Sequence, residues 1–272
     1  MPTTSEKRAQ FRRLHESGCF VIPNPWDVGT ARYLQGMGFK ALASTSAGFA
    51  WSRGAADGGV TRETVLAHLA ELSAAVDVPV NADFEGGFAD APEGVAESVR
   101  LCVETGVSGL SIEDFTGDRA NPLYDLDLAV ARIKAARAAI DKAGGDVLLT
   151  GRSEGFIRGK PDLDETIRRL QAYAQAGADC LYAPGIATRE QISAVVAAAA
   201  PKPVNLLMGT PSPLTVKDLE ALGVRRISVG GSLARAAWGG FIRAAKQIAE
   251  GGSFNGFADA APSAELNKAL KG

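Results

Sequence analysis

The sequence predicts an α/β protein whose single large domain is a (β/α)8 TIM barrel. Three observations favour this fold. Short apolar segments alternate with helical patterns eight times along the chain. The apolar segments are nearly uninterrupted, as in parallel strands that are buried on both faces. The 272 residues, 46% of them hydrophobic, match the roughly 250 residues of a typical barrel. We expect the barrel over residues 1–251 and a C-terminal extension over residues 252–272.

Eight β-branched or apolar runs are expected to form the barrel strands. Two tandem doubly wound sheets would also alternate strands with helices. However, no linker composition separates two halves, and no GxGxxG motif follows the first run. One barrel therefore explains the pattern better. The expected strands are Phe20–Asn24, Ala41–Thr45, Val78–Phe84, Gly109–Asp114, Val147–Arg152, Cys180–Pro184, Pro203–Met208 and Arg226–Gly230.

Between these strands, apolar residues recur about every 3.6 positions, which is the period of an amphipathic helix. Several of the segments begin with Asp, Ser or Thr and several end in Gly, the residues that commonly cap helix ends. The extension ends in an amphipathic stretch that would pack on its own barrel or contact a partner. The clearest helical segments are residues 61–76, 91–106, 125–144, 162–177, 188–200 and 232–252.

The composition excludes several classes of protein. Lys and Arg total 29 against 31 for Asp and Glu, so the net charge of −2 provides no basic field for nucleic acid or an anionic membrane surface. No apolar run reaches the length of about 18 residues that spans a bilayer. The polar N-terminus also lacks the apolar core of a signal peptide. We therefore expect a cytoplasmic protein with no nucleic-acid or membrane partner.

Cysteine and histidine are too sparse for most metal or nucleophile sites. Cys19, Cys102 and Cys180 lie far apart without a CxxC spacing, which indicates neither a zinc knuckle nor a disulfide framework. His15 and His68 fall in helical segments and are expected to be solvated or packed between helices. Catalysis is therefore expected to proceed largely without histidine, which disfavours Ser-His-Asp and Cys-His mechanisms.

Charged residues stand at the ends of three adjacent strands. Asp83 and Glu85 end the third, two positions apart and so expected on one side of it. Glu113 and Asp114 end the fourth, and Arg152 ends the fifth. Because the C-terminal ends of barrel strands share one opening, these carboxylates suit Mg²⁺, or Mn²⁺, with retained water. Arg152 either binds a substrate carboxylate through two hydrogen bonds or belongs to a network that only stabilises the barrel.

Two further segments have features of anion sites. The second strand ends in Ser44, Thr45 and Ser46, whose hydroxyl and backbone N–H groups suit an oxyanion, although small polar residues are ordinary at such turns. Gly230 and Gly231 stand at the start of a helix, where an anion could bind. Tight packing explains these two glycines equally well.

Together, these segments resemble the phosphoenolpyruvate mutase/isocitrate lyase superfamily over about residues 10–250. The combined third- and fourth-strand motifs are specific, whereas PVN or AGAD alone would be poor indicators. The matching segments are NPWD at 24–27, STSAG at 44–48, Asp57 before GGVTRE, NADFEGGF at 81–88, GLSIED at 109–114, GRSEGF at 151–156, QAGAD at 175–179 and PVNLL at 203–207.

The resemblance implies a Mg²⁺-dependent enzyme that acts on a small 2-oxo acid or phosphonate through an enolate, whose developing negative charge the metal and backbone donors stabilise. It also implies a homo-oligomer, commonly a tetramer arranged as a dimer of dimers, in which the eighth helix is exchanged between subunits. The metal is expected to lie, partly through water, between three carboxylates carried over by motif: Asp83, Glu85 and Glu113.

The resemblance assigns roles to further residues. Asp57 matches the second-strand carboxylate that supports the metal. Thr45, Ser46 and Ala47 match the segment that binds the substrate oxyanion, with Ser44 included if the alignment shifts by one position. Arg152 matches the residue that pairs with the substrate carboxylate.

The loop Phe115–Asp125 departs from the superfamily pattern. It lacks the Cys and His of the isocitrate and methylisocitrate lyases, which argues against those two activities, and Ala183-Pro184-Gly185 replaces their glutamate at the sixth strand. The mutases carry a Lys and an Asn in this loop. Asn121 stands near the latter position and is a candidate phosphoryl-transfer residue, although Asn before Pro is ordinary in a turn.

Two reactions and one binding role therefore stay open. The reactions are phosphonomutase-like cleavage or rearrangement of the C–P bond β to the carbonyl, and oxaloacetate-decarboxylase-like cleavage of the corresponding C–C bond. The alternative is a non-catalytic barrel that binds a 2-oxo acid. The missing acid/base residue in the loop favours that alternative, whereas the intact set of metal carboxylates favours an enzyme.

Overall fold

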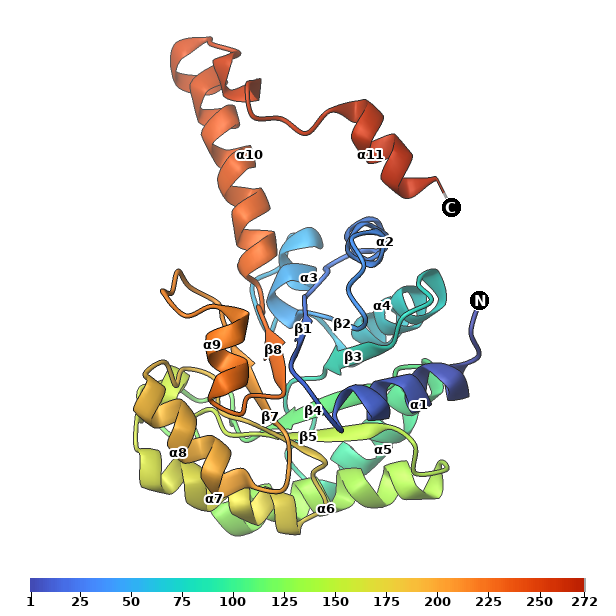
Figure 1. Cartoon of the computed structure of the whole chain (residues 1–272), viewed down its shortest axis with the longest axis vertical. Helices are drawn as coiled ribbons and strands as arrows, with labels where there is room; N and C mark the ends of the chain where they lie inside the picture. Colours follow the sequence, from blue (N-terminus) through green and yellow to red (C-terminus); the bar gives the residue numbers. More distant parts are fainter. Residues whose placement is uncertain (272) are drawn as a thin grey trace.

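The computed structural model describes residues 1–271 and confirms the (β/α)8 barrel (Figure 1). Eight parallel strands form one sheet in the order β1-β8-β7-β6-β5-β4-β3-β2, so the chain does not fold as two tandem sheets. The strands are β1 (Phe20–Ile22), β2 (Leu42–Ala43), β3 (Val80–Asp83), β4 (Gly109–Glu113), β5 (Leu148–Arg152), β6 (Cys180–Tyr182), β7 (Val204–Leu207) and β8 (Arg226–Ser228).

The strands are shorter than the sequence predicted, which moves several polar residues into the loops beyond them. The clearest case is Glu85. Strand β3 ends at Asp83, and the chain then turns, with the N–H of Gly87 donating to the carbonyl of Phe84 at 2.9 Å. Glu85 has a left-handed backbone with a φ of 49°. Strand alternation therefore cannot determine where Glu85 lies relative to Asp83, because the strand has already ended.

All six helices named from the sequence are present, and shorter ones accompany them. Predicted caps are confirmed at α4, α7 and α8, where Thr61, Asp162 and Thr188 accept hydrogen bonds from backbone N–H groups three residues on. The helices are α1 (Thr4–Leu14), α2 (Val28–Gly36), α3 (Ser46–Ser52), α4 (Arg62–Ala75), α5 (Pro92–Glu104), α6 (Leu126–Lys142), α7 (Leu163–Gln175), α8 (Arg189–Ala199), α9 (Val216–Ala221), α10 (Ser232–Gly251) and α11 (Ser263–Leu270), with short 3-10 turns at Gly155–Arg158 and Asn255–Phe257.

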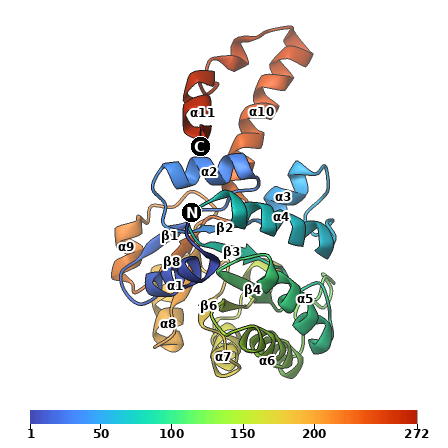
Figure 2. The same ribbon diagram turned by 90° about the vertical axis from the view of Figure 1, so that its right-hand side faces the viewer.

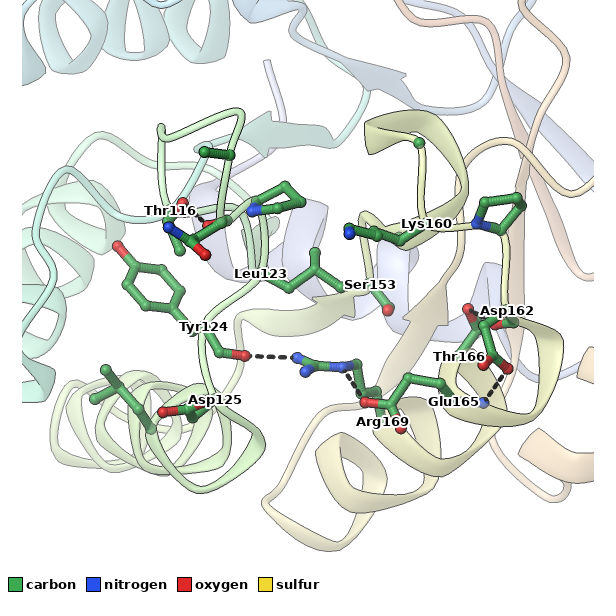
Figure 3. A pocket seen from close by; sticks show the side chains of 17 residues that line it. Thr116, Leu123, Tyr124, Asp125, Ser153, Lys160, Asp162, Glu165, Thr166 and Arg169 are labelled. Carbon is green, nitrogen blue, oxygen red and sulfur yellow. Dashed lines mark hydrogen bonds and ion pairs between the residues drawn. The ribbon is translucent and has the colours of Figure 1, made fainter.

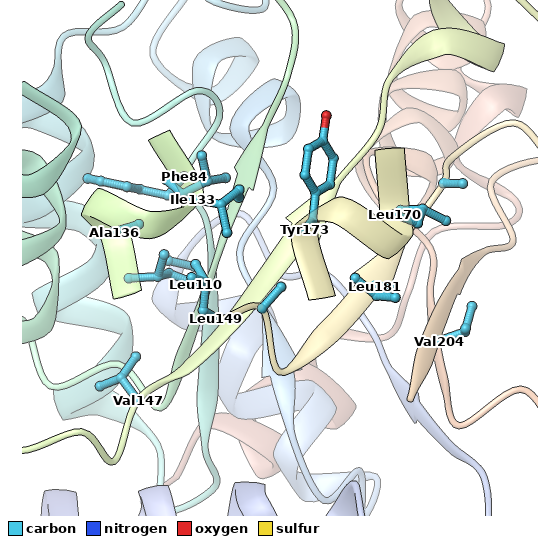
Figure 4. Close-up of a cluster of buried hydrophobic side chains, with 14 of the residues drawn as sticks. Phe84, Leu110, Ile133, Ala136, Val147, Leu149, Leu170, Tyr173, Leu181 and Val204 are labelled. Atoms are coloured by element: carbon cyan, nitrogen blue, oxygen red, sulfur yellow. The ribbon is translucent and has the colours of Figure 1, made fainter. Parts of the chain in front are cut away.

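The main hydrophobic core lies between the sheet and its surrounding helices (Figure 4). Leu110 and Leu149 point outward from β4 and β5, and Ile133 of α6 and Tyr173 of α7 pack onto them. All four side chains are buried. This layer fixes β4 and β5, whose C-terminal ends carry Glu113 and Arg152.

Helix α1 packs across the N-terminal ends of the strands. Phe11 is fully buried in a cluster with Ile22 and Leu148. A side chain on Gly109, the first residue of β4, would come within 2.6 Å of the Phe11 ring, so this position requires glycine. His15 ends the helix and meets the rings of Phe11 and Phe20 edge-on. The helix therefore closes the bottom of the barrel.

Strands β1 and β2 are not joined by a ladder, and we call this place the seam. One backbone hydrogen bond crosses it, from the N–H of Ala43 to the carbonyl of Pro23 at 3.0 Å. The side chain of Asn24 also crosses it. Its amide nitrogen donates to the carbonyl of Ser44 at 2.8 Å, while its oxygen accepts the N–H groups of Val229 and Gly230 at 2.9 Å each.

Helix α10 extends away from the barrel, and the chain returns so that α11 lies beside α2 (Figures 1 and 2). Tyr33 of α2 donates its hydroxyl hydrogen to Glu265 of α11 at 2.9 Å. Ala234 is the only buried residue of α10, and Trp238 and Phe241 are exposed. No helix within residues 1–271 is long and apolar enough to cross a membrane.

Candidate active site

A cavity of about 160 Å³ lies inside the barrel toward the C-terminal ends of the strands. We call the charged cluster at these strand ends the mouth. Asp57, Asp83 and Arg152 of this cluster line the cavity, whereas Glu85, Glu113, Glu154 and Arg158 pair with or lie near them without lining it. We call the polar layer beneath the mouth the floor: Asn81, Thr150, Asn205 and Arg226. The predicted residues Ser44, Thr45, Ser46, Ala47, Asp57, Asp83 and Arg152 all line the cavity.

Asp83 is the centre of the hydrogen bonding at the mouth. Its Oδ2 accepts both the N–H and the hydroxyl of Ser46 at 2.9 Å, and its Oδ1 accepts from Arg152 Nη1 at 3.3 Å. The N–H of Asp83 donates to Ser44 Oγ at 2.8 Å. The third strand, the second-strand segment and the fifth strand are therefore brought together at this carboxylate.

The second-strand segment leaves two backbone donors without a partner within residues 1–271, the N–H groups of Thr45 and Ala47. Thr45 Oγ1 caps α3 by accepting the N–H of Gly48 at 3.2 Å. The N–H of Ser46 is used by Asp83. The first N–H groups of a helix have no partner inside it, so the N–H of Ala47 remains for a ligand in the cavity.

Arg152 pairs with three carboxylates, and one of them was missed by the sequence reasoning. Its guanidinium lies 2.5 Å from Glu154, 3.3 Å from Asp83 and 3.3 Å from Glu113. Glu154 has no exposed surface and also holds Arg158 at 2.9 Å. The available signal was the glutamate two residues beyond Arg152 in GRSEGF, which entered the sequence analysis only as part of a motif.

The mouth has more negative charge than its two arginines balance. Burial, followed by the charges of Asp83 and Asp57, raises the pKa of Glu85 to about 7. Burial and then the charge of Asp83 raise the pKa of Asp57. Burial also raises the pKa of Glu113, against the opposing effect of Arg152. This excess of negative charge at the mouth is the environment in which a bound cation is expected.

The chemistry of this donor set fits Mg²⁺ that is held mainly through water. Within residues 1–271, no group of three or more His, Cys, Asp or Glu side chains is placed so that it could hold a metal ion directly. Asp57, Asp83, Glu85 and Glu113 nevertheless supply carboxylate oxygens from neighbouring loops and strands, and Mg²⁺ keeps several of its waters in such sites. Asp83, Glu85 and Glu113 would hold the ion, with Asp57 supporting them.

A buried arginine that the sequence reasoning missed holds the turn carrying Glu85. Arg132 of α6 donates to the carbonyls of Gly86 and Ala89 at 2.5 Å and of Asp90 at 2.8 Å. Its guanidinium stacks on the ring of Tyr124, whose hydroxyl donates to Asp90 at 2.5 Å. The left-handed backbone at Glu85 is thus fixed by contacts to the residues that follow it.

Asn121 does not lie with the other predicted residues. Its side chain donates to Asp118 Oδ2 at 3.2 Å and is exposed. It lines a separate cavity of about 890 Å³ between the loop after β4 and the segment after β5 (Figure 3). Arg169 on its wall is already paired with Glu165 and Asp114. The role of Asn121 in phosphoryl transfer stays a prediction without support from this placement.

The floor differs from the mouth and was also missed by the sequence reasoning. Arg226 is the first residue of β8 and is 3% exposed. Its guanidinium lines the cavity from below and hydrogen-bonds to Asn205 and Thr150. Gly230 and Gly231 line the same cavity at the start of α10. His68 packs between helices as expected, stacking on Phe49 of α3 with 3.8 Å between ring centroids, whereas His15 contacts Phe20 of β1 and Arg226 of β8.

Comparison with known proteins places these features among relatives. The family profile described as phosphoenolpyruvate phosphomutase matches residues 11–249. An uncharacterized protein of Mycobacterium tuberculosis is 33% identical over 89% of each chain. The oxaloacetate decarboxylase of Paraburkholderia xenovorans is 31% identical over 83% of this chain and 75% of its own. A crystal structure of a candidate lyase/mutase from Burkholderia cenocepacia J2315 is 48% identical, covers 99% of this chain and 97% of its own, and superposes with a TM-score of 0.94.

Proposed function

This chain belongs to the phosphoenolpyruvate phosphomutase family, and we propose that it is a Mg²⁺-dependent enzyme that cleaves a C–C bond of a small 2-oxo acid. The observation that carries the proposal is the convergence of Asp83, Arg152 and the Ser46–Ala47 backbone on one cavity. The cavity is slightly larger than the 150 Å³ that holds benzene in an engineered core. It therefore suits a substrate of three or four carbons.

Two observations favour C–C over C–P chemistry. Asn121, the candidate contact for a migrating phosphoryl group, hydrogen-bonds within its own loop and lines a different cavity. A relative that covers 83% of the chain is an oxaloacetate decarboxylase. We therefore propose oxaloacetate-type acids as the substrate class, in preference to phosphonopyruvate.

The chain's own residues bind and orient the substrate. Arg152 and Ala47 both line the cavity, where the guanidinium would pair with the C1 carboxylate and the N–H of Ala47 would donate to a substrate oxygen. Asp83 fixes the position of Ser46, and with it the first turn of α3. The mainly apolar side chains of Ile22, Leu207 and Tyr182 also line the cavity and limit water beside the reacting carbons.

The bound metal would supply a Lewis acid for the oxygen on which enolate charge develops. Asp83, Glu85 and Glu113 are proposed to hold it, and Asp57 to support it. Arg152 pairs with both Asp83 and Glu113, so its guanidinium links the two carboxylates. Arg158 adds a second cation beside Glu154.

A turnover assay tests this function directly. Purified protein is incubated with Mg²⁺ and either oxaloacetate or phosphonopyruvate, and all products are followed by NMR. We expect Mg²⁺-dependent loss of oxaloacetate above the uncatalysed rate, abolished by EDTA. Turnover of phosphonopyruvate alone would establish the C–P reaction instead. Oxalate binding with no turnover of either acid would establish the non-catalytic binding role.

We also propose that the chain assembles through α10. Trp238, Phe241 and Ile242 stand on this projecting helix and are each at least 40% exposed, which is unusual for a monomer's surface. Exchange of the helix with a second copy would cover them. Light scattering at micromolar concentration should show a dimer or tetramer, and Trp238→Glu with Phe241→Glu should shift the mass toward the monomer. A stable wild-type monomer would contradict the assembly.

A further inference from the structure

The floor of the cavity contains a buried guanidinium whose partners are all neutral. Arg226 donates from Nε to Asn205 Oδ1 at 2.8 Å and from Nη2 to Thr150 Oγ1 at 3.0 Å. Its Nη1 lies 3.3 Å from His15 Nε2 and 3.5 Å from Asn81 Oδ1. Within residues 1–271 it forms no ion pair.

The residues around Arg226 do not supply a compensating charge. The side chains of Asn205, Asn81 and Thr150 do not ionise, and His15 can only be neutral or positive. A guanidinium carries five N–H groups, and these contacts use four, so one N–H on Nη2 has no acceptor within the described chain. A buried charge without a counter-charge is costly, and the open side of this one faces a cavity.

The same cavity connects Arg226 with the mouth. Arg152 lies two positions beyond Thr150 on β5, and Thr150 is the residue to which Arg226 donates. Two positions along a strand span about 6.6 Å. That separation between the two levels is close to the length of an extended four-carbon diacid. The mouth already has excess negative charge, whereas the floor has an unbalanced positive one.

We propose that Arg226 forms a second carboxylate subsite, which binds the distal carboxylate of a four-carbon diacid that carries oxygen on C2. The inference rests on the proposed function, because the C1 carboxylate and the C2 oxygen are placed at the mouth. Pairing with Arg226 stabilises the charge of the distal carboxylate.

Binding measurements with three unreactive acids test the subsite. L-Malate and L-lactate differ by the distal carboxylate, and oxalate chelates a metal at the mouth without reaching the floor. Calorimetry with Mg²⁺ should show L-malate binding at least about 10-fold more tightly than L-lactate to the wild-type protein. One charge-assisted hydrogen bond corresponds to roughly a 10- to 150-fold change in affinity. Arg226→Gln should weaken L-malate by that factor and leave oxalate within about threefold.

Two further variants complete the test. Arg226→Lys keeps the charge and should retain part of the preference for L-malate. Arg225→Gln removes the partly exposed neighbouring arginine and should bind all three acids as the wild type does. Equal wild-type affinities for L-malate and L-lactate would overturn the subsite. Equal losses of affinity for oxalate and L-malate in Arg226→Gln would overturn it as well. Failure of the wild-type protein to bind oxalate would instead count against the proposed function.

Discussion

The mouth and the floor of the barrel place opposite charges at the two ends of one cavity. At the mouth, five carboxylates share Arg152 and Arg158, and burial together with mutual repulsion raises the pKa of Glu85 to about 7. At the floor, the partners of Arg226 within the described chain are amide, hydroxyl and imidazole groups. The mouth is suited to a cation and the floor to an anion. The cavity can therefore orient a ligand that binds a metal ion at one end and carries a carboxylate at the other.

The largest expected effect comes from removing the carboxylate at the centre of the mouth. Asp83→Ala deletes the acceptor for Ser46 and one partner of Arg152. Mg²⁺-dependent oxalate binding, measured by calorimetry, should therefore fall below detection while circular dichroism stays unchanged. Asp141→Ala, which removes an exposed carboxylate on α6, serves as the control. Oxalate binding that survives in Asp83→Ala would remove this residue from the metal site.

A smaller effect is expected from Arg152→Lys, which keeps the charge but loses the planar fork. If Arg152 binds the substrate carboxylate, the loss of one charge-assisted hydrogen bond of roughly 1.5–3 kcal/mol should lower kcat/KM about 10- to 150-fold. Arg158→Lys is the matched control, because Arg158 shares Glu154 but does not line the cavity. Near-normal kcat/KM together with a markedly lower Tm in the Arg152→Lys variant would show that Arg152 only neutralises its carboxylates.

The smallest expected effect tests the floor through His15. Burial and then the charge of Arg226 lower the pKa of His15 to about 3. In the unfolded chain the imidazole takes up a proton below about pH 6.5, whereas the folded protein does not, so stability falls as the pH drops below 6.5. At pH 5 the cost is about 2 kcal/mol. Urea unfolding at pH 7.5 and pH 5.0 measures it.

His15→Gln removes this titration and keeps an acceptor for Arg226. The difference in unfolding free energy between the two pH values should shrink by about 2 kcal/mol relative to the wild type. An unchanged difference would mean that the imidazole is protonated in the folded protein, and that the floor tolerates a second positive charge beside Arg226.

The sequence predicted the mouth better than the floor, for a physical reason. Asp83, Glu113 and Arg152 interrupt apolar strands at their ends, where a charge has no packing explanation. Arg226 stands beside Arg225 at the start of a strand, and such a pair is typical of surface charge. Which of the two points inward depends on the register of β8 with β7, and that register is set by pairing across the barrel.

Glu85 was assigned to the site by motif, and strand alternation does not determine where it lies. Its placement depends on where β3 stops and on three carbonyl contacts from Arg132, a residue on a helix far along the chain. The alternation of side chains along a strand predicts neither the end of β3 nor these contacts. Helix α6 itself was predicted, yet its pattern does not reveal that one of its arginines turns inward and binds backbone carbonyls.

The seam between β1 and β2 gives the barrel one place where local opening requires little bond breaking. Elsewhere, neighbouring strands exchange a ladder of hydrogen bonds, whereas here one backbone bond and the side chain of Asn24 make the connection. Native-state amide exchange should therefore be fastest at the N–H of Ala43 among the strand amides. Ser44 to Ala47 follow directly, so a small hinge movement of β2 would reposition these donors while the other strands keep their register.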